Sequence, residues 1–407
     1  MGLIDNIKSY SKQVTLSPEK TKLLKSFFEK GFPTIKDEEW KYTSLKKITT
    51  QNFSIEQNGS TFNKSEIQNY SLGFKNKLIF INGKLVSSPA INGVSITGVS
   101  DFKSEDADSI SQLNSSLAKK GVTIKVEKNT KVDAPIEIIF FTNTKNDNFI
   151  QYRNKIAIGD NAQIKFIERI QNLSDAKCFV NHFTKIAIGK NSDVEYNKIQ
   201  DNTKNSILLD AVNISQKSDS VCNVNTLIFG GSFTRNTLNF EQNGSNCDSN
   251  MNGVSILDNN QFADNHTFVN HKQPHCRSNE MYKGIYLENS KGVFNGKIMV
   301  CPDAQKIDAF QSNNNLLLSE NATIDSKPQL EIYADDVKCS HGCTIGQLDD
   351  DALFYMRSRG IAQKEAKAVL TYAFASEAIN NMSIPEVKKM AQKLIAKKLN
   401  VDLDFNL

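Results

Sequence analysis

The sequence contains a repeat with a period of about thirty residues, and this repeat restricts the fold more than any other feature. The segment KIAIGDNAQI begins at Lys155, and KIAIGKNSDV begins at Lys185. Weaker copies, each an apolar alternation followed by a turn rich in Gly, Asn, Ser and Asp, begin at Asn213, Asn239, Tyr286 and Leu317. Periodic β-units with polar turns predict stacked coils or blades rather than a sandwich. Because each unit is shorter than the ~40 residues of a propeller blade, we expect a β-solenoid.

The predicted turns of this region are rich in Asn, which tolerates the left-handed backbone and whose side chains can stack in ladders. On both sides of the repeats the pattern becomes helical. The fold class we predict is therefore mainly β with flanking α. The predicted domains are an N-terminal helical domain (1–75), a hairpin and linker (76–120), a β-helix core (121–346) and a C-terminal helical domain (347–407).

Local signals support these divisions. Ser17 is a candidate helix cap, with Pro18 in the first turn and Gly31 as the stop. The segment LIFINGKLV (78–86) predicts a hairpin with Asn-Gly at its turn. In the last zone, one predicted helix carries its apolar stripe on Ala366, Val369, Leu370, Ala373 and Phe374. We expect this stripe to pack against the rest of its own domain.

Composition limits the function classes. The net charge of +4 comes from 49 basic and 45 acidic residues, and the Lys residues are scattered, so no nucleic-acid partner is expected. No apolar run approaches the ~18 residues of a transmembrane helix, and MGLIDNIKSY lacks the apolar region of a signal peptide. Seven Cys without framework-like spacing favour a reducing compartment. We therefore expect a soluble cytoplasmic protein without a membrane partner.

The segment CSHGC carries three soft donors on alternate positions, Cys339, His341 and Cys343. In an extended chain these side chains point to one face. Thiolate and imidazole suit zinc, copper and iron–sulfur clusters, but a closed zinc site needs four ligands. The chain contains no CxxC, so neither a second ligand pair nor a thioredoxin-type centre is present. The pattern indicates either a partial metal site or a buried Cys with a hydrogen-bonded His at a turn.

A second group of soft donors lies within eleven residues, at His266, His271, His275 and Cys276. A metal-entry or transient iron site is one interpretation, because the spacing of the histidines resembles that of zinc ligands. We favour the other interpretation, turn and ladder histidines of the solenoid, because no Cys pair anchors the group. The chain has no GxxxxGK[ST], GxSxG or HExxH motif, so any ATP chemistry is expected from another subunit.

Three stretches resemble one known family. The segment LEIYADDVKCSHGCTIGQLDDDALFYMRSRGI (330–361) resembles the C-terminal signature of the SufB/SufD family of iron–sulfur cluster assembly scaffold proteins. PTIKDEEWKYTSL (33–45) resembles its N-terminal entry motif, and residues 266–300 resemble its later core. Together the resemblance covers about residues 30 to 380. SufB tends to be longer and to carry an N-terminal CxxC cluster, so the lack of CxxC favours the SufD branch.

The resemblance implies a right-handed parallel β-helix flanked by two helical domains, and a non-catalytic scaffold. It implies that the chain pairs with SufB through the β-helices and binds the ATPase SufC through the C-terminal helices. Without SufB, we expect a homodimer through the β-helix end nearest Cys339, because an open solenoid edge must be covered. Cys339 and His341 would lie at the SufB interface and bind a nascent Fe–S cluster that the partner completes, with Cys343 as an extra ligand or simply a buried thiol. The aromatic helix then places Leu353, Phe354, Tyr355 and Arg357 on or beside the SufC-binding surface.

Two other classes of function stay open on the sequence. A β-helix enzyme of the secreted, polysaccharide-acting type needs paired carboxylates or a calcium-carboxylate groove, together with secretion. The apparent lack of a signal peptide and of a repeated Asp ladder disfavours it. A stand-alone metal-binding structural protein needs a fourth zinc ligand that the CSHGC segment does not supply.

Overall fold

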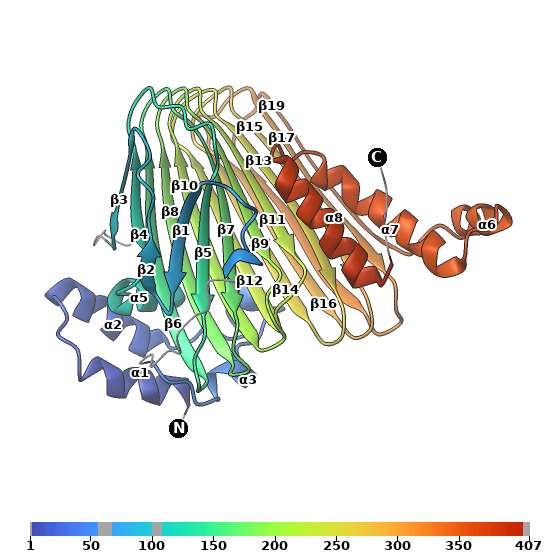
Figure 1. Ribbon diagram of the computed structural model, residues 1–407. Coiled ribbons are helices and arrows are strands. Elements are labelled where there is room, and N and C mark those ends of the chain that lie inside the picture. Colours follow the sequence, from blue (N-terminus) through green and yellow to red (C-terminus); the bar gives the residue numbers. More distant parts are fainter. Residues whose placement is uncertain (1, 56–66, 100–107, 402–407) are drawn as a thin grey trace.

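The computed structural model describes residues 2–55, 67–99 and 108–401, and its centre is a two-sheeted parallel β-helix (Figure 1). Across these residues the strands form a ten-stranded sheet in the order β19-β17-β15-β13-β11-β9-β7-β5-β1-β2 and a nine-stranded sheet in the order β18-β16-β14-β12-β10-β8-β6-β4-β3. Consecutive strands from β4 onward alternate between the sheets, so each coil contributes one strand to each. This confirms the predicted fold class.

The strands of the two sheets have the following bounds. The nine-stranded sheet contains β3 (Val94–Gly98), β4 (Val122–Val126), β6 (Asn148–Ile158), β8 (Cys178–Ile188), β10 (Ser206–Gln216), β12 (Phe233–Gln242), β14 (Phe262–His271), β16 (Lys291–Val300) and β18 (Thr323–Ile332). The ten-stranded sheet contains β1 (Asn76–Ile81), β2 (Lys84–Ser87), β5 (Ile136–Thr142), β7 (Gln163–Asn172), β9 (Asp193–Gln200), β11 (Val221–Ile228), β13 (Asp248–Leu257), β15 (Arg277–Tyr286), β17 (Ile307–Leu317) and β19 (Val337–Gly346). β1 and β2 form the antiparallel hairpin predicted at the Asn-Gly turn.

The sequence repeat corresponds to the pairing of successive coils. The two KIAIG copies lie on β6 and β8, where Lys155 pairs with Lys185 and each following residue pairs with its counterpart. At the turns, Asn129, Asn161 and Asn191 all have positive φ. Asn161 Nδ2 donates to Asn129 Oδ1 at 2.9 Å, and Asn191 Nδ2 donates to Asn161 Oδ1 at 3.0 Å. The predicted Asn ladder is therefore present.

The interior of the β-helix is filled by inward-facing apolar side chains from both sheets. Aromatic residues close the end that begins the stack, where Phe80 stacks on Phe140 with ring centroids 4.6 Å apart and Tyr152 lies 4.6 Å from Phe140. Burial of this apolar surface is the main stabilising contribution of the stack. Farther along the stack, polar residues enter the interior, and they are described below.

Helices cover the outer face of each sheet. The N-terminal group contains α1 (Leu3–Ser11), α2 (Pro18–Lys30), η1 (Glu38–Trp40), α3 (Lys46–Thr49) and α5 (Ser109–Leu117). Its apolar residues share one cluster with Phe149, Phe179 and Ile207 on the outer face of the nine-stranded sheet. The C-terminal helices α7 (Gln363–Ile379) and α8 (Pro385–Leu399) cover the ten-stranded sheet, whose outer apolar residues pack against theirs.

Helix α6 (Asp350–Ser358) is arranged differently from the other helices, because it projects away from the β-helix (Figure 1). Its N-terminus is capped by Asp349, whose carboxylate accepts from the backbone of Asp351 and Ala352. None of its residues is buried. Among the described helices, none is both long and apolar enough to span a bilayer.

Candidate metal site at the open end of the β-helix

The last coil of the β-helix, formed by β18 and β19, is an open edge. Within the described residues, β18 pairs only with β16 and β19 only with β17, so each strand presents one edge without a neighbour. Unpaired edge backbone is a template for another strand. Large apolar side chains are exposed at this end, with Tyr333 at 62% and Ile345 at 51% exposure. These features fit a surface that a second protein chain covers.

The three donors of the CSHGC segment all lie on β19 and face the interior side of this open coil. Cys339, His341 and Cys343 pair in register with Ala309, Gln311 and Asn313 of β17, respectively. These three β17 residues are buried inside the β-helix. Because paired residues of parallel strands point to the same side of a sheet, the donors continue the lumen outward. The structure therefore gathers them along one line, as their alternate spacing predicts.

The environments of the three donors differ. Cys339 is half-buried beside an apolar cluster, and burial, with a smaller contribution from the Asp308 carboxylate, raises the pKa of its thiol. The Cys343 side chain is exposed, and its Sγ lies 3.1 Å from Ser326 Oγ on β18. His341 is exposed at the mouth. Since a metal ion binds the thiolate form, coordination by Cys339 has to release a proton.

The second predicted donor group is not brought together. His266 faces outward from β14 into a cavity of about 380 Å³ that Trp40 also lines. There His266 Nε2 lies 3.0 Å from Asp264 Oδ1, and the Arg235 guanidinium pairs with Asp264 and stacks 3.8 Å from the Trp40 ring centre. This arrangement clamps the N-terminal EEW segment to the nine-stranded sheet.

The other members of that group lie elsewhere. His271 is buried and its Nε2 is 3.0 Å from Ser278 Oγ, while burial lowers the pKa of its imidazole to about 4. His275 has positive φ (61°) at a turn of the β-helix. Cys276 is buried against Cys247, whose backbone N–H donates to its Sγ at 3.4 Å. The placement of His275 and His271 matches the turn and ladder interpretation.

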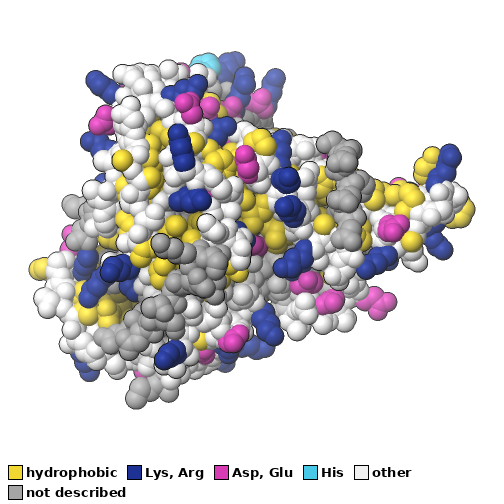
Figure 2. All heavy atoms as spheres, viewed as in Figure 1, with side chains coloured by type: hydrophobic (Ala, Val, Ile, Leu, Met, Phe, Trp, Pro, Cys, Tyr) yellow, Lys and Arg dark blue, Asp and Glu magenta, His cyan; other side chains and the backbone are white. Residues whose placement is uncertain are grey.

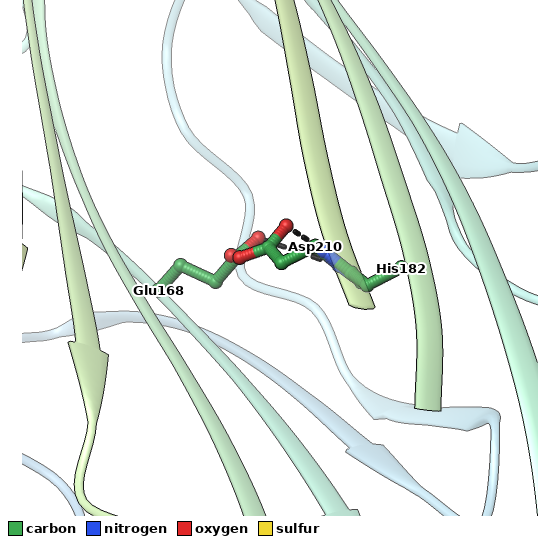
Figure 3. A group of neighbouring side chains, drawn as sticks. All are labelled: Glu168, His182 and Asp210. Carbon is green, nitrogen blue, oxygen red and sulfur yellow. Dashed lines mark hydrogen bonds and ion pairs between the residues drawn. The ribbon is translucent and has the colours of Figure 1, made fainter. Parts of the chain in front are cut away.

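Sequence reasoning missed one group of charged residues inside the β-helix. Among the described residues, Glu168, His182 and Asp210 are the group whose potential metal-ligating atoms lie within 4.8 Å of one another, and all three are buried (Figure 3). His182 Nδ1 lies 3.1 Å from Asp210 Oδ1, and its Nε2 lies 3.5 Å from Glu168 Oε2. The sequence contained one indication of this group. His182 and Asp210 are 28 residues apart, close to the repeat length, and they pair in register on adjacent coils.

The charges of Glu168, His182 and Asp210 are compensated by neighbouring side chains. The Lys198 ammonium lies 2.8 Å from Asp210 Oδ2, and Tyr196 donates to Glu168 Oε2 at 2.6 Å. Burial alone would raise the pKa of Asp210, but the Lys198 and His182 charges hold it below the usual range. Burial raises the pKa of Glu168. Burial alone would lower the pKa of the His182 imidazole, but the carboxylates of Glu168 and Asp210 raise it. A cation bound here would lie beside the Lys198 ammonium, which is unfavourable.

The residues predicted to dock an ATPase lie on the projecting helix α6. Phe354 is 73% exposed and Tyr355 is 59% exposed, and the Arg359 guanidinium lies over the Tyr355 ring at 5.2 Å. Leu353 is half-buried, and Arg357 is exposed near the end of the helix. Figure 2 shows apolar side chains at the tip of the molecule that α6 forms. Exposed aromatic residues on a projecting helix are typical of a protein-binding surface.

The fold and the site together define a parallel β-helix protein with an open last coil, one partial donor set at its mouth and helices on both faces. The family model for the SUF system FeS cluster assembly SufBD core domain matches residues 140–374, which is more than half of the chain. This chain therefore belongs to the SufB/SufD family.

Individual relatives agree with this membership. The chain is 29% identical over 394 residues to the iron–sulfur cluster assembly protein SufD of Escherichia coli, covering 94% of this chain and 93% of the relative. It is 27% identical over 395 residues to an iron–sulfur cluster assembly SufBD family protein of Synechocystis, covering 89% and 87%. It is also 25% identical over 299 residues to SufD of Bacillus subtilis, covering 72% and 68%. The chain is SufD-like.

Proposed function

We propose that this chain is the SufD-type scaffold subunit of a SUF complex, and that it pairs with SufB to build an Fe–S cluster between the two β-helices. The observation that carries the proposal is the open last coil, where Cys339, His341 and Cys343 line the mouth of the lumen and the strand edges are unpaired. A matching coil from SufB covers the edge and completes the ligand set. The nascent cluster is cargo, assembled there and passed on.

In this proposal His341 is a neutral imidazole ligand and Cys339 a thiolate ligand. Imidazole ligation of a cluster iron has precedent in Rieske centres. The raised pKa of the Cys339 thiol keeps it protonated in the free subunit, so binding of iron drives the loss of its proton. Cys343 is accessible beside Ser326 and adds a second thiol to the same line.

The proposal extends to two further partners. ATP hydrolysis is assigned to SufC, which docks on the C-terminal helices with Phe354 and Tyr355 of α6 at or beside the contact. In the absence of SufB, a second copy of this chain covers the open edge and gives a homodimer. The complex is expected in the cytoplasm, with no nucleic acid or membrane involved, and this subunit itself is expected to be non-catalytic.

Among the residues that the structure describes, the clustered carboxylates do not suit the enzyme alternative. The buried carboxylates of Glu168 and Asp210 are enclosed in the β-helix interior beside Lys198. A polysaccharide chain cannot reach them, whereas a glycosidase places its two carboxyl groups on either side of an accessible bond.

The test is anaerobic co-expression of the chain with SufB and SufC, followed by iron and sulfide analysis of the purified complex beside thermal unfolding. His341→Ala is expected to assemble normally, because exposed positions change stability by only about ±0.5 kcal/mol, yet to lose most of its iron. Cys339→Ser is expected to lose less iron if Cys343 substitutes, and a double Cys change more. A His341→Ala complex with full cluster content would contradict the proposed site.

A further inference from the structure

A row of polar side chains on successive coils extends from His341 into the buried lumen of the β-helix. Glu280 of β15, Gln311 of β17 and His341 of β19 pair in register on three successive coils. Glu280 and Gln311 are both 0% exposed. Neighbouring strands are ~4.8 Å apart, so the His341 ring is within reach of the Gln311 amide. Burying polar groups such as those of Glu280 and Gln311 costs free energy unless they are hydrogen-bonded. Their hydrogen-bond partners therefore have to be identified.

The Gln311 amide is held at one end. Its Nε2 donates to Glu280 Oε2 at 3.2 Å, and the same Oε2 accepts from Thr267 Oγ1 at 2.6 Å. Glu280 Oε2 accepts a hydrogen bond from the Thr267 hydroxyl, so it also acts as an acceptor toward the Gln311 amide. The NH₂ group of that amide, rather than its oxygen, therefore faces Glu280. The amide oxygen is thereby directed to another partner. This orientation does not require Glu280 to be ionised, since a proton on its other oxygen leaves Oε2 an acceptor.

The other end of the amide has no partner within the chain. Gln311 Oε1 is a buried oxygen without a hydrogen-bond partner among the described residues. Leaving such an acceptor unpaired costs about 1–3 kcal/mol. The opposite sheet also accommodates this side chain, because a Cβ at Gly296 would lie only 1.6 Å from Gln311 Nε2. The β-helix therefore makes room for an extended glutamine whose oxygen is left available.

We propose that Gln311 is a positioning residue for His341. In the SufB-paired complex, Gln311 Oε1 accepts a hydrogen bond from the His341 ring nitrogen that does not bind iron, while Glu280 and Thr267 hold the amide in that orientation. Metal-binding histidines usually donate their second N–H to an oxygen acceptor, which sets the tautomer and ring direction. This inference rests on the proposed role of His341 as a ligand and adds the residues behind it.

The experiment compares two substitutions at position 311 in the full complex purified with SufB and SufC. Gln311→Met keeps the volume and removes the acceptor, whereas Gln311→Glu keeps an acceptor oxygen. The readout is the rate at which the anaerobic complex loses iron to excess bipyridine. Loss of such an acceptor typically weakens metal binding 10–100-fold, so we expect Gln311→Met to lose iron about ten times faster or more. Gln311→Glu should stay within about threefold of the unmodified complex.

A matched control lies on the same strand. Asn315 is also buried and faces the lumen, but it pairs with Ile345 rather than with a donor. Asn315→Leu should leave the rate of iron loss unchanged, even if it lowers the melting temperature as much as Gln311→Met does. If Gln311 acted only by filling space, Met would release iron at the normal rate and Glu would be the worse variant. That ordering would overturn the inference.

The variant His341→Ala distinguishes the ligand role of His341 from the positioning role of Gln311. Rapid iron loss from His341→Ala together with a normal rate for Gln311→Met would reject the positioning role and leave the proposed function intact. A normal rate for both variants would reject the proposed ligand and, with it, the inference. Rapid loss from His341→Ala and Gln311→Met, with rescue by Gln311→Glu, supports both.

Discussion

The buried carboxyl group of Glu280 should make the free energy of unfolding depend on pH. This carboxyl is fully buried, and burial raises its pKa from 4.5 to about 7, although hydrogen bonds from Thr267 and Gln311 act in the opposite direction. The shift of roughly 2.5 pH units corresponds to about 3.4 kcal/mol at 1.36 kcal/mol per unit. We therefore expect Glu280→Gln, which cannot ionise, to become more stable relative to the unmodified protein as pH rises.

The sign follows from proton binding. Between pH 4.5 and 7 the folded state holds the Glu280 proton more tightly than the unfolded state does, so the free energy of unfolding of the unmodified protein falls as pH rises through this window. From pH 5 to pH 8 the loss amounts to about 2.5 kcal/mol. At about 2.1 cal/mol/K per residue, 407 residues give an unfolding entropy near 0.85 kcal/mol/K. The expected change is thus about 3 °C.

The assay is thermal unfolding of both proteins at pH 5, 6, 7 and 8 in buffers of equal ionic strength. The melting temperature of Glu280→Gln minus that of the unmodified protein should increase by about 3 °C across the series. Glu320→Gln serves as the control, because Glu320 is exposed and remains in water in both states. A difference that stays constant with pH, or decreases, would refute the reasoning about the buried carboxyl.

Three further results are expected. Lys198→Met should lower the free energy of unfolding in urea by about 3–5 kcal/mol because it leaves a buried carboxylate uncompensated, while exposed Lys204→Met should change it by less than about 0.5 kcal/mol; equal effects would contradict the charge compensation. Asn191→Ala should lose about 1–2 kcal/mol through its left-handed backbone, and Asn191→Gly should recover part of this. The double change Phe354→Ala and Tyr355→Ala should leave the melting temperature unchanged and weaken SufC binding by about 2 kcal/mol or more, as measured by calorimetry; undiminished binding would exclude α6 from the contact.

Much of the fold was predictable because the repeat is encoded locally. A parallel stack places equivalent residues of successive coils side by side, so a period in the sequence becomes a register in space, as with Lys155 and Lys185. Asn at the turns was informative for a similar reason, since the left-handed backbone is a property of the single residue. The alternate spacing of the CSHGC donors likewise predicted their common face, because a strand has a period of two.

The helical packing was less predictable. The predicted stripe of α7 included Val369 and Ala373, but the buried residues are Ala366, Ala368, Thr371, Ala375, Ala378 and Ile379. Val369 is only partly buried, and Ala373 is exposed. All of these buried residues except Ile379 are small, whereas the bulkier Leu370, Tyr372 and Phe374 are only partly buried. Hydrophobic periodicity identifies an apolar face of a helix. It does not decide whether a face of small side chains or a neighbouring face of larger ones is buried.

By itself, the sequence determined the repeat, the turn ladder, the alternation of the three donors and the family resemblance, because each depends on residues close together in the chain or on a fixed period. Only the tertiary structure decided which coil is left open and what stands behind it. Glu168, His182 and Asp210 come from three coils, and Glu280, Gln311 and His341 from three others. Charge balance and hydrogen-bond orientation between such residues depend on distances across the lumen, and these arise only when the coils stack.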